Sequence, residues 1–276
     1  MDESIIGTLK VPGATLHYEQ RGSGPVLLLI PGGSADAGLY AAMTADLAAH
    51  YTVVSYDPRG LSRSPLDGPL TDQRVEEWSD DAHRLLELLS PDGPASVLGC
   101  SSGAIVATDL LARHPERLRR VVAHEPPLLE LLEDPAPHRA LFAEVRDLFR
   151  KEGIGPAMAR FSEGLGGGDR PAEQATELPP EIQEMAPRMH ANMPVFLEHM
   201  LCQFSSTVPD LPALRASAGK LVPAAGTESR GQEPLYGPAA RLADLLGVPM
   251  AEFPGGHLGA VERPKEFAER LLTALG

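Results

Sequence analysis

A chain of 276 residues, of which 43% are hydrophobic, can bury the core of one large domain and is too apolar for an intrinsically disordered protein. The formal net charge of −14 argues against nucleic acid as a partner, because phosphate binding needs a basic surface. The two cysteines are too few for a disulfide framework and the first residues lack a secretory signal, so we expect a cytoplasmic protein.

The first half of the chain predicts strands that alternate with helices. Apolar runs bounded by proline or glycine indicate strands, and apolar residues at helical spacing indicate helices. The strongest apolar run, residues 26–30, is far too short to cross a bilayer, so no membrane contact is expected. The expected strands are 4–10, 14–20, 26–30, 51–56 and 95–98, and the expected helices are 36–49, 72–89 and 104–113.

The second half resumes this alternation after a long interruption. Residues 126–212 are rich in proline, methionine and leucine, and they predict a helical cap inserted over the sheet. Strand and helix alternation predicts an α/β protein with a doubly wound, mostly parallel sheet, whose core comprises residues 1–125 and 213–276. The remaining expected elements are strands 118–123, 221–225 and 248–253, and a final helix 264–275.

The pentapeptide Gly99-Cys100-Ser101-Ser102-Gly103 lies where an expected strand passes into an expected helix. A G-x-S-x-G sequence in this context is typical of a nucleophile elbow, in which the glycines permit a tight turn and a strained serine projects from the sheet. Ser101 is therefore the predicted nucleophile. A serine hydroxyl also needs a base, an acid that orients the base, and donors for the developing oxyanion.

Two glycine-rich loops supply the base and the donors. His257 is the predicted base, because it lies in such a loop after the last strand and before the last helix. The other loop, residues 31–34, ends the third strand, so the backbone amides of Gly33 and Ser102 are the predicted oxyanion donors. No metal site is expected, because the histidines show neither H-E-x-x-H nor paired-cysteine spacing.

Two glutamates are candidates for the acid. Glu228 follows the next-to-last strand, which is the usual place when the chain order is serine, acid, histidine. Glu125 follows the strand after the elbow helix, and that strand should end on the same sheet edge as Ser101. Pro126 and Pro127 would terminate the strand there. The position favours Glu125, and Glu228 remains the alternative.

In the order of these motifs, the chain resembles the α/β-hydrolase superfamily over almost its whole length outside the cap. Several segments, and the interval between Ser101 and Glu125, resemble the zearalenone lactone hydrolase group. Members of that group have a glutamate at this earlier strand end as the catalytic acid, so the resemblance also favours Glu125. Phe196 stands where the group has a tryptophan that contacts substrate. The resembling segments are 18–20 (YEQ), 99–104 (GCSSGA), 124–127 (HEPP) and 190–196 (HANMPVF).

These features together predict a serine hydrolase that cleaves a carboxylic ester or lactone of a moderately large apolar molecule without a cofactor. A cofactor-free lyase, a perhydrolase or a small-molecule receptor on the same fold is the alternative, and a homodimer is left open. The methionines and aromatic residues of the cap suit an apolar pocket. The predicted substrate-binding residues are Gly32, Ser34, Met193, Phe196 and Leu258.

Overall fold

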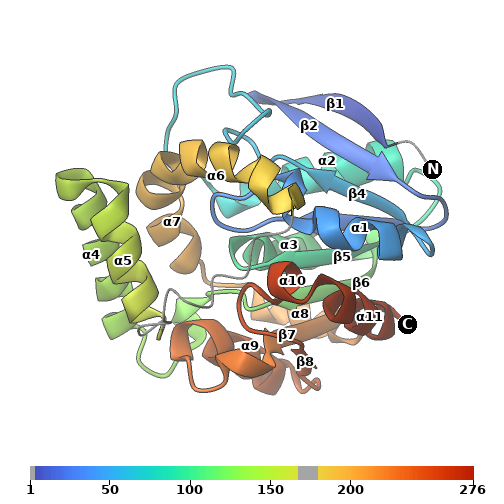
Figure 1. The fold of residues 1–276 in the computed structure, drawn as a ribbon. Coiled ribbons are helices and arrows are strands. Elements are labelled where there is room, and N and C mark those ends of the chain that lie inside the picture. Colours follow the sequence, from blue (N-terminus) through green and yellow to red (C-terminus); the bar gives the residue numbers. More distant parts are fainter. Residues whose placement is uncertain (1–3, 167–179) are drawn as a thin grey trace.

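The centre of the computed structural model, which describes residues 4–166 and 180–276, is an eight-stranded sheet (Figure 1). The strands are β1 (Ile5–Val11), β2 (Ala14–Arg21), β3 (Val26–Ile30), β4 (Thr52–Tyr56), β5 (Ala95–Cys100), β6 (Leu118–His124), β7 (Leu221–Gly226) and β8 (Ala251–Phe253). They lie in the order β1-β2-β4-β3-β5-β6-β7-β8. β2 is antiparallel to both β1 and β4, whereas all other neighbours are parallel. The predicted doubly wound, mostly parallel sheet is confirmed.

Helices cover both faces of this sheet (Figure 1). They are α1 (Ala41–Ala48), α2 (Val75–Leu89), α3 (Ser102–Arg113), α9 (Glu233–Leu246), α10 (Gly259–Glu262) and α11 (Pro264–Leu275). Successive side chains of a strand point to opposite faces, so Leu27 and Leu29 of β3 join the core beneath α1 and α11, and Leu28 and Ile30 join the core beneath α2 and α3. Burial on both faces explains why β3 is a continuous apolar run.

The chain between β6 and β7 contributes a further group of helices. They are α4 (Ala136–Glu152), α5 (Ile154–Gly164), α6 (Pro180–His199), α7 (Leu201–Ser205) and α8 (Leu211–Ala216). In Figure 1, α4 and α5 stand side by side, away from the sheet, and α6 runs from beside α7 towards α1. The ring of Phe204 in α7 meets Trp78 of α2 edge-on, with centroids 5.1 Å apart. Residues 167–179 of the predicted cap lie outside the described residues, and its boundaries at 126 and 212 stay a prediction.

The expected helix 36–49 is a 3-10 turn, Ala37–Tyr40, followed by α1, and both α2 and β8 also begin later than the sequence predicts. The N–H of Gln73 donates to the carbonyl of His199 in a hydrogen bond of 2.9 Å, so the residues before α2 bind α6 instead of forming a helical turn. The N–H of Val248 donates to the carbonyl of Ala243, and Pro249 has no N–H to give to a neighbouring strand. A contact between distant segments therefore shortens α2, whereas a local bond at the end of α9 and a proline shorten β8.

Candidate active site

Ser101 lies in the turn between β5 and α3, with backbone angles that side-chain-bearing residues rarely adopt. Its φ is 55° and its ψ is −126°. A Cβ on Gly99 would lie 2.2 Å from the carbonyl oxygen of Gly103, and a Cβ on Gly103 would lie 2.3 Å from that of Ile30. Only glycine fits at these two positions, so the packing of the pentapeptide forces the serine into a strained, projecting conformation.

The neighbouring Cys100 is not a competing nucleophile. Burial raises the pKa of its thiol to about 12, although a hydrogen bond with Tyr40 acts in the opposite direction. The thiolate is the nucleophilic form of cysteine, so this thiol is unreactive near neutral pH. Ser101 is therefore the candidate nucleophile of the turn.

His257 and Glu125 follow different strands and meet in the structure. Nδ1 of His257 lies 2.6 Å from Oε2 of Glu125. The Glu125 side chain is fully buried, and its Oε1 accepts a hydrogen bond of 2.8 Å from the N–H of Gly226 at the end of β7. The backbone N–H of Glu125 donates to the carbonyl of Ala224, also at 2.8 Å. Bonds to β7 thus fix both the backbone and the side chain of Glu125.

The charge of Glu125 follows from these contacts. Burial alone would raise its pKa, but the hydrogen bond from His257, the attraction of the His257 and His124 rings when they are protonated, and the amide of Gly226 lower the pKa to about 2. Glu125 is therefore a carboxylate near neutral pH and can only accept hydrogen bonds. Nδ1 of His257 must then carry the proton, which leaves Nε2 as the basic nitrogen.

The alternative acid, Glu228, forms an ion pair at the surface. Its side chain is exposed, and its Oε1 is 2.6 Å from Nη2 of Arg263. The hydrogen bond to His257 belongs to Glu125 instead. Of the two candidates left by the sequence, the structure brings Glu125 to the histidine.

The loop after β3 approaches the nucleophile turn closely. A Cβ on Gly32 would lie 2.4 Å from the carbonyl oxygen of Cys100 and 2.6 Å from Cβ of Ser101. The N–H of Gly33 donates to the hydroxyl of Ser102 at 2.8 Å, a contact that sequence analysis did not foresee. The N–H of Ser102 lies in the first turn of α3, where amides have no acceptor within the helix. Both predicted donors therefore lie at the turn.

Ser101 and His257 line the same cavities, which shows that they share one site. Among the hydrogen bonds of the described residues, none joins the Ser101 hydroxyl to the histidine ring. Nucleophile and base contacts are often long in ligand-free active sites and tighten when substrate binds. The structure brings the two groups together without the bond that catalysis would need.

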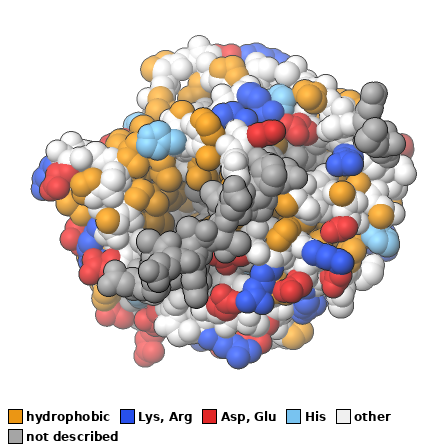
Figure 2. All heavy atoms as spheres, in the orientation of Figure 1, with side chains coloured by type: hydrophobic (Ala, Val, Ile, Leu, Met, Phe, Trp, Pro, Cys, Tyr) orange, Lys and Arg blue, Asp and Glu red, His pale blue; other side chains and the backbone are white. Residues whose placement is uncertain are grey.

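A largely hydrophobic cavity of about 180 Å³ lies over Ser101. In Figure 2, hydrophobic side chains gather in a hollow between the α4 and α5 pair and the rest of the molecule. Met158 of α5 and Met189 of α6 form part of the cavity wall, and flexible methionines adapt to apolar ligands of varied shape. All the predicted substrate-binding residues line this cavity: Gly32, Ser34, Met193, Phe196 and Leu258.

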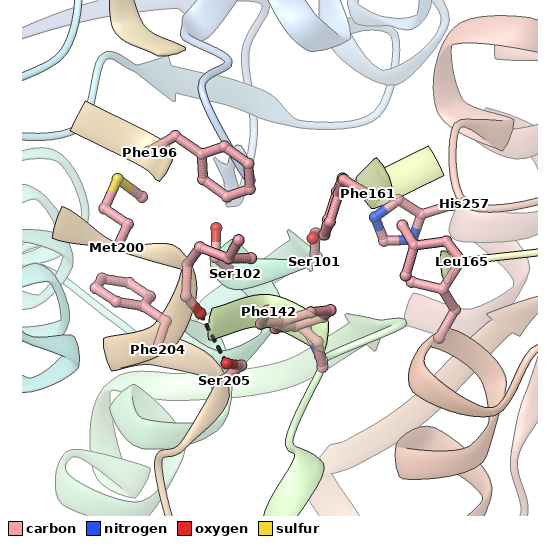
Figure 3. Close-up of a pocket in the computed structure, with 13 residues that line it drawn as sticks. Ser101, Ser102, Phe142, Phe161, Leu165, Phe196, Met200, Phe204, Ser205 and His257 are labelled. Carbon is pink, nitrogen blue, oxygen red and sulfur yellow. Dashed lines mark hydrogen bonds between the residues drawn. The ribbon is translucent and has the colours of Figure 1, made fainter. Parts of the chain in front are cut away.

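A narrower cavity of about 30 Å³ adjoins Ser101 as well (Figure 3). Phe161 of α5 and Phe196 of α6 line both cavities, with ring centroids 6.0 Å apart, so they lie where the cavities meet. Sequence analysis missed Phe161 and also Phe142 of α4, which lines the narrower cavity. Phe161 follows Met158 by three residues on one face of α5, and this helical spacing was the signal that could have found it.

Comparison with known proteins identifies the family. Residues 25–165, just over half of the chain, match the family described as the alpha/beta hydrolase fold. The chain belongs to this family. An uncharacterized hydrolase of Bacillus subtilis (strain 168), YraK, is 40% identical to it over 96% of this chain and 94% of the relative. A zearalenone hydrolase of Bionectria ochroleuca is 30% identical over 95% of this chain and 94% of the relative.

A thermophilic esterase from Thermogutta terrifontis is similar in structure to this alpha/beta hydrolase, with a TM-score of 0.76, 19% identity, and coverage of 99% of this chain and 98% of that chain. At such low identity the likeness shows the fold alone. Sequence relatives and fold together make the protein a hydrolase of the alpha/beta fold, and the resemblance read from its motifs is confirmed.

Within residues 4–166 and 180–276, no helix is long and apolar enough to cross a membrane. In the same part of the chain, no group of three or more His, Cys, Asp and Glu residues could hold a metal ion.

Proposed function

We propose that this alpha/beta hydrolase cleaves a carboxylic ester or lactone of an apolar small molecule through an acyl-enzyme. Ser101 is the nucleophile, His257 the general base and Glu125 the acid that orients it. The observation that carries the proposal is the 2.6 Å contact between the buried Glu125 carboxylate and Nδ1 of His257, because the His257 ring lines the same cavity as the strained Ser101.

In the first half of the proposed reaction, Nε2 of His257 takes the proton of Ser101 as its oxygen attacks the substrate carbonyl. The resulting imidazolium is stabilised by the Glu125 carboxylate. The amides of Gly33 and Ser102 donate to the oxyanion, whose oxygen replaces the Ser102 hydroxyl as the acceptor of the Gly33 amide.

The second half of the reaction releases the two products. His257 returns its proton to the leaving alcohol oxygen, which breaks the bond between that oxygen and the acyl carbon. The same histidine then activates a water molecule, and attack on the acyl-enzyme frees the carboxylic acid and regenerates Ser101. For a lactone, the acid and the alcohol are two ends of one opened chain.

The substrate class follows from the cavity and the relatives. The cavity over Ser101 is lined mainly by methionine, phenylalanine, leucine and valine side chains, which favours a neutral apolar molecule. The relative from Bionectria ochroleuca, a zearalenone hydrolase, supports a bulky substrate of this kind for the present chain. We assign residues 126–212 to a cap that selects the substrate.

Labelling and turnover test the proposal together. The purified protein should react with a fluorophosphonate at Ser101, located by peptide mass spectrometry, and should hydrolyse a nitrophenyl acetate. Product detection over a panel of esters and lactones would then identify the preferred class. Labelling without turnover of any panel member would favour a receptor, and labelling at another residue would exclude the proposed nucleophile.

A further inference from the structure

The cap helix α6 is bound to the loop that carries Gly33 through one buried side chain, Asn192, which is only 5% exposed. Its Nδ2 donates to the carbonyl oxygen of Ser34 at 2.9 Å and to the hydroxyl of Ser62 at 2.8 Å. Its Oδ1 accepts the N–H of Ser62 at 2.9 Å. Both ends of the amide are therefore used, and each contact reaches a core loop remote in sequence.

The contact with Ser34 falls on a tight turn. The N–H of Ala35 donates to the carbonyl of Gly32 at 3.1 Å, which closes the turn formed by residues 32–35. Gly33 and Ser34 are the central residues of this turn, and Gly33 has a φ of 58°. The Asn192 amide thus holds the peptide between Ser34 and Ala35, whose N–H is bonded to the carbonyl of the peptide that carries the Gly33 N–H.

We propose that Asn192 is a positioning residue, which fixes the 32–35 turn so that the amide of Gly33 points to the oxyanion. The inference rests on the proposed function, because it assumes that Gly33 is an oxyanion donor. Stabilisation by such donors depends on their being held in place before the reaction, and a shift of about 1 Å can cost on the order of 100-fold in rate. α6 also carries Met193 and Phe196, so one helix sets both the cavity wall and the donor.

The chemistry of this junction requires an amide. The hydroxyl of Ser62 donates to Oδ2 of Asp36 at 2.8 Å, so its oxygen is the acceptor for Asn192. A carboxylate at position 192 could still accept the N–H of Ser62, but its other oxygen would face the carbonyl of Ser34 and the Ser62 oxygen with no proton to offer. Asn192→Asp therefore replaces two attractive contacts by repulsive ones while keeping the side chain's shape.

A second link between α6 and the core provides the matched control. Arg188, one turn earlier on α6, donates through Nη2 to Oδ1 of the buried Asp36 at 3.1 Å. Within the described residues, the hydrogen bonds of Arg188 go to Asp36 and to the carbonyl of Glu184, and none goes to the carbonyl of Ser34. Arg188→Met therefore weakens the attachment of the helix but leaves the bond between Asn192 and the turn.

The experiment compares steady-state hydrolysis of nitrophenyl acetate, a substrate too small to need the cap, by the wild type, Asn192→Asp and Arg188→Met. For Asn192→Asp we expect kcat to fall about 10- to 100-fold with KM changed less than about 3-fold and the pH profile kept. Arg188→Met should lower the melting temperature but keep kcat within about 3-fold. An unchanged kcat in folded Asn192→Asp, or equal losses in both variants, would overturn the assignment.

An oxyanion analogue separates positioning from general structural damage. A methyl trifluoromethyl ketone adds to Ser101 as a hemiketal whose oxygen occupies the proposed hole, so its affinity should fall in Asn192→Asp by the same factor as kcat/KM. If Asn192→Asp does not fold, Asn192→Ala, which adds no charge, should show the same proportional loss. If either folded variant binds the analogue as tightly as the wild type does, the inference about Asn192 is wrong and the proposed function still stands. If the wild type neither hydrolyses esters nor reacts with a fluorophosphonate, the proposed function itself is wrong.

Discussion

The floor and the roof of the main cavity are built in opposite ways. The floor consists of backbone turns at the sheet edge, where Gly32, Gly99 and Gly103 approach neighbouring atoms too closely for any side chain. The roof consists of long side chains from α5 and α6, among them Phe196 and Met193. The difference indicates that the floor fixes the chemistry, because its geometry has no freedom, while the roof can change shape and set selectivity.

The largest effect should follow from removing the nucleophile in the floor. Ser101→Ala should lower kcat for a nitrophenyl ester on the order of 10⁵-fold or more, because no hydroxyl remains to form the acyl-enzyme. The cavity keeps its shape, so the affinity for an apolar product should change little. Ser205→Ala is the control, since Ser205 also lines the narrower cavity but bonds to the carbonyl of Leu201 within α7. Comparable losses in both variants would contradict the assignment.

The next effect concerns the acid. Glu125→Gln should lower kcat about 10³- to 10⁴-fold, because an amide cannot stabilise the imidazolium of His257 and favours the wrong tautomer. Its fold should persist, since the amide oxygen can still accept the N–H of Gly226. Glu228→Gln, which removes the charge from the exposed ion pair with Arg263, should stay within about 3-fold of the wild type. The hydrolysis rates of the two variants, measured by stopped flow or in the steady state, check this expectation. If Glu228→Gln were the slower enzyme, Glu228 and not Glu125 would be the acid.

The free energy of unfolding should depend on pH through His124 and Glu125, which lie at the end of β6 beneath the floor. His124 is fully buried against Phe253 and Phe267, and burial lowers its pKa from 6.5 to about 4. The unfolded chain therefore binds a proton below pH 6.5 that the folded chain does not, so the free energy of unfolding should decrease by a few kcal/mol as the pH falls from 6.5 to 4. Glu125, with its lowered pKa, adds a further loss between pH 4.5 and 2.

Urea unfolding at several pH values checks this expectation. In His124→Phe, which keeps an aromatic ring but cannot be protonated, the decrease between pH 6.5 and 4 should be smaller than in the wild type by the contribution of the histidine. An identical decrease in the two proteins would show that another group is responsible.

The smallest effect should come from the roof. Phe196→Ala should raise KM for bulky apolar esters about 5- to 30-fold, which corresponds to the loss of about 1 to 2 kcal/mol of apolar contact. The value of kcat/KM for nitrophenyl acetate should change less than about 3-fold, because a small ester does not reach the ring. Equal losses on both substrates would mean that Phe196 supports the fold or the chemistry and would remove the distinction between roof and floor.

The floor was largely predictable from the sequence, because local rules determine it. Ser101 is indicated by its two flanking glycines, and Glu125 by the end of a strand next to the elbow strand in a parallel sheet. His257 is indicated by its loop before the last helix. Each of these predictions needs only the order of strands, which apolar runs reveal well.

The rest could not be predicted, because it depends on contacts between segments that are remote in the chain. Asn192 reads as an ordinary polar residue of a helix until α6 is placed against residues 34 and 62. The bond from the amide of Gly33 to the Ser102 hydroxyl depends on how closely the β3 loop approaches α3. The position of Phe161 depends on how α5 packs over the sheet. The periodicity of apolar residues in the sequence does not predict distances between such remote segments.

The strained backbone at the site has an evolutionary consequence. Of the residues that the structure describes, Ser62, Ser101 and Glu125 are the non-glycine residues with positive φ, and all three belong to the site or to the junction with α6. Glycine at position 101 would relieve roughly 1 kcal/mol of this cost and remove the hydroxyl that we propose as the nucleophile. Selection for stability alone would not favour a serine there, so the proposed activity gives the reason for keeping it at the expense of a more robust fold.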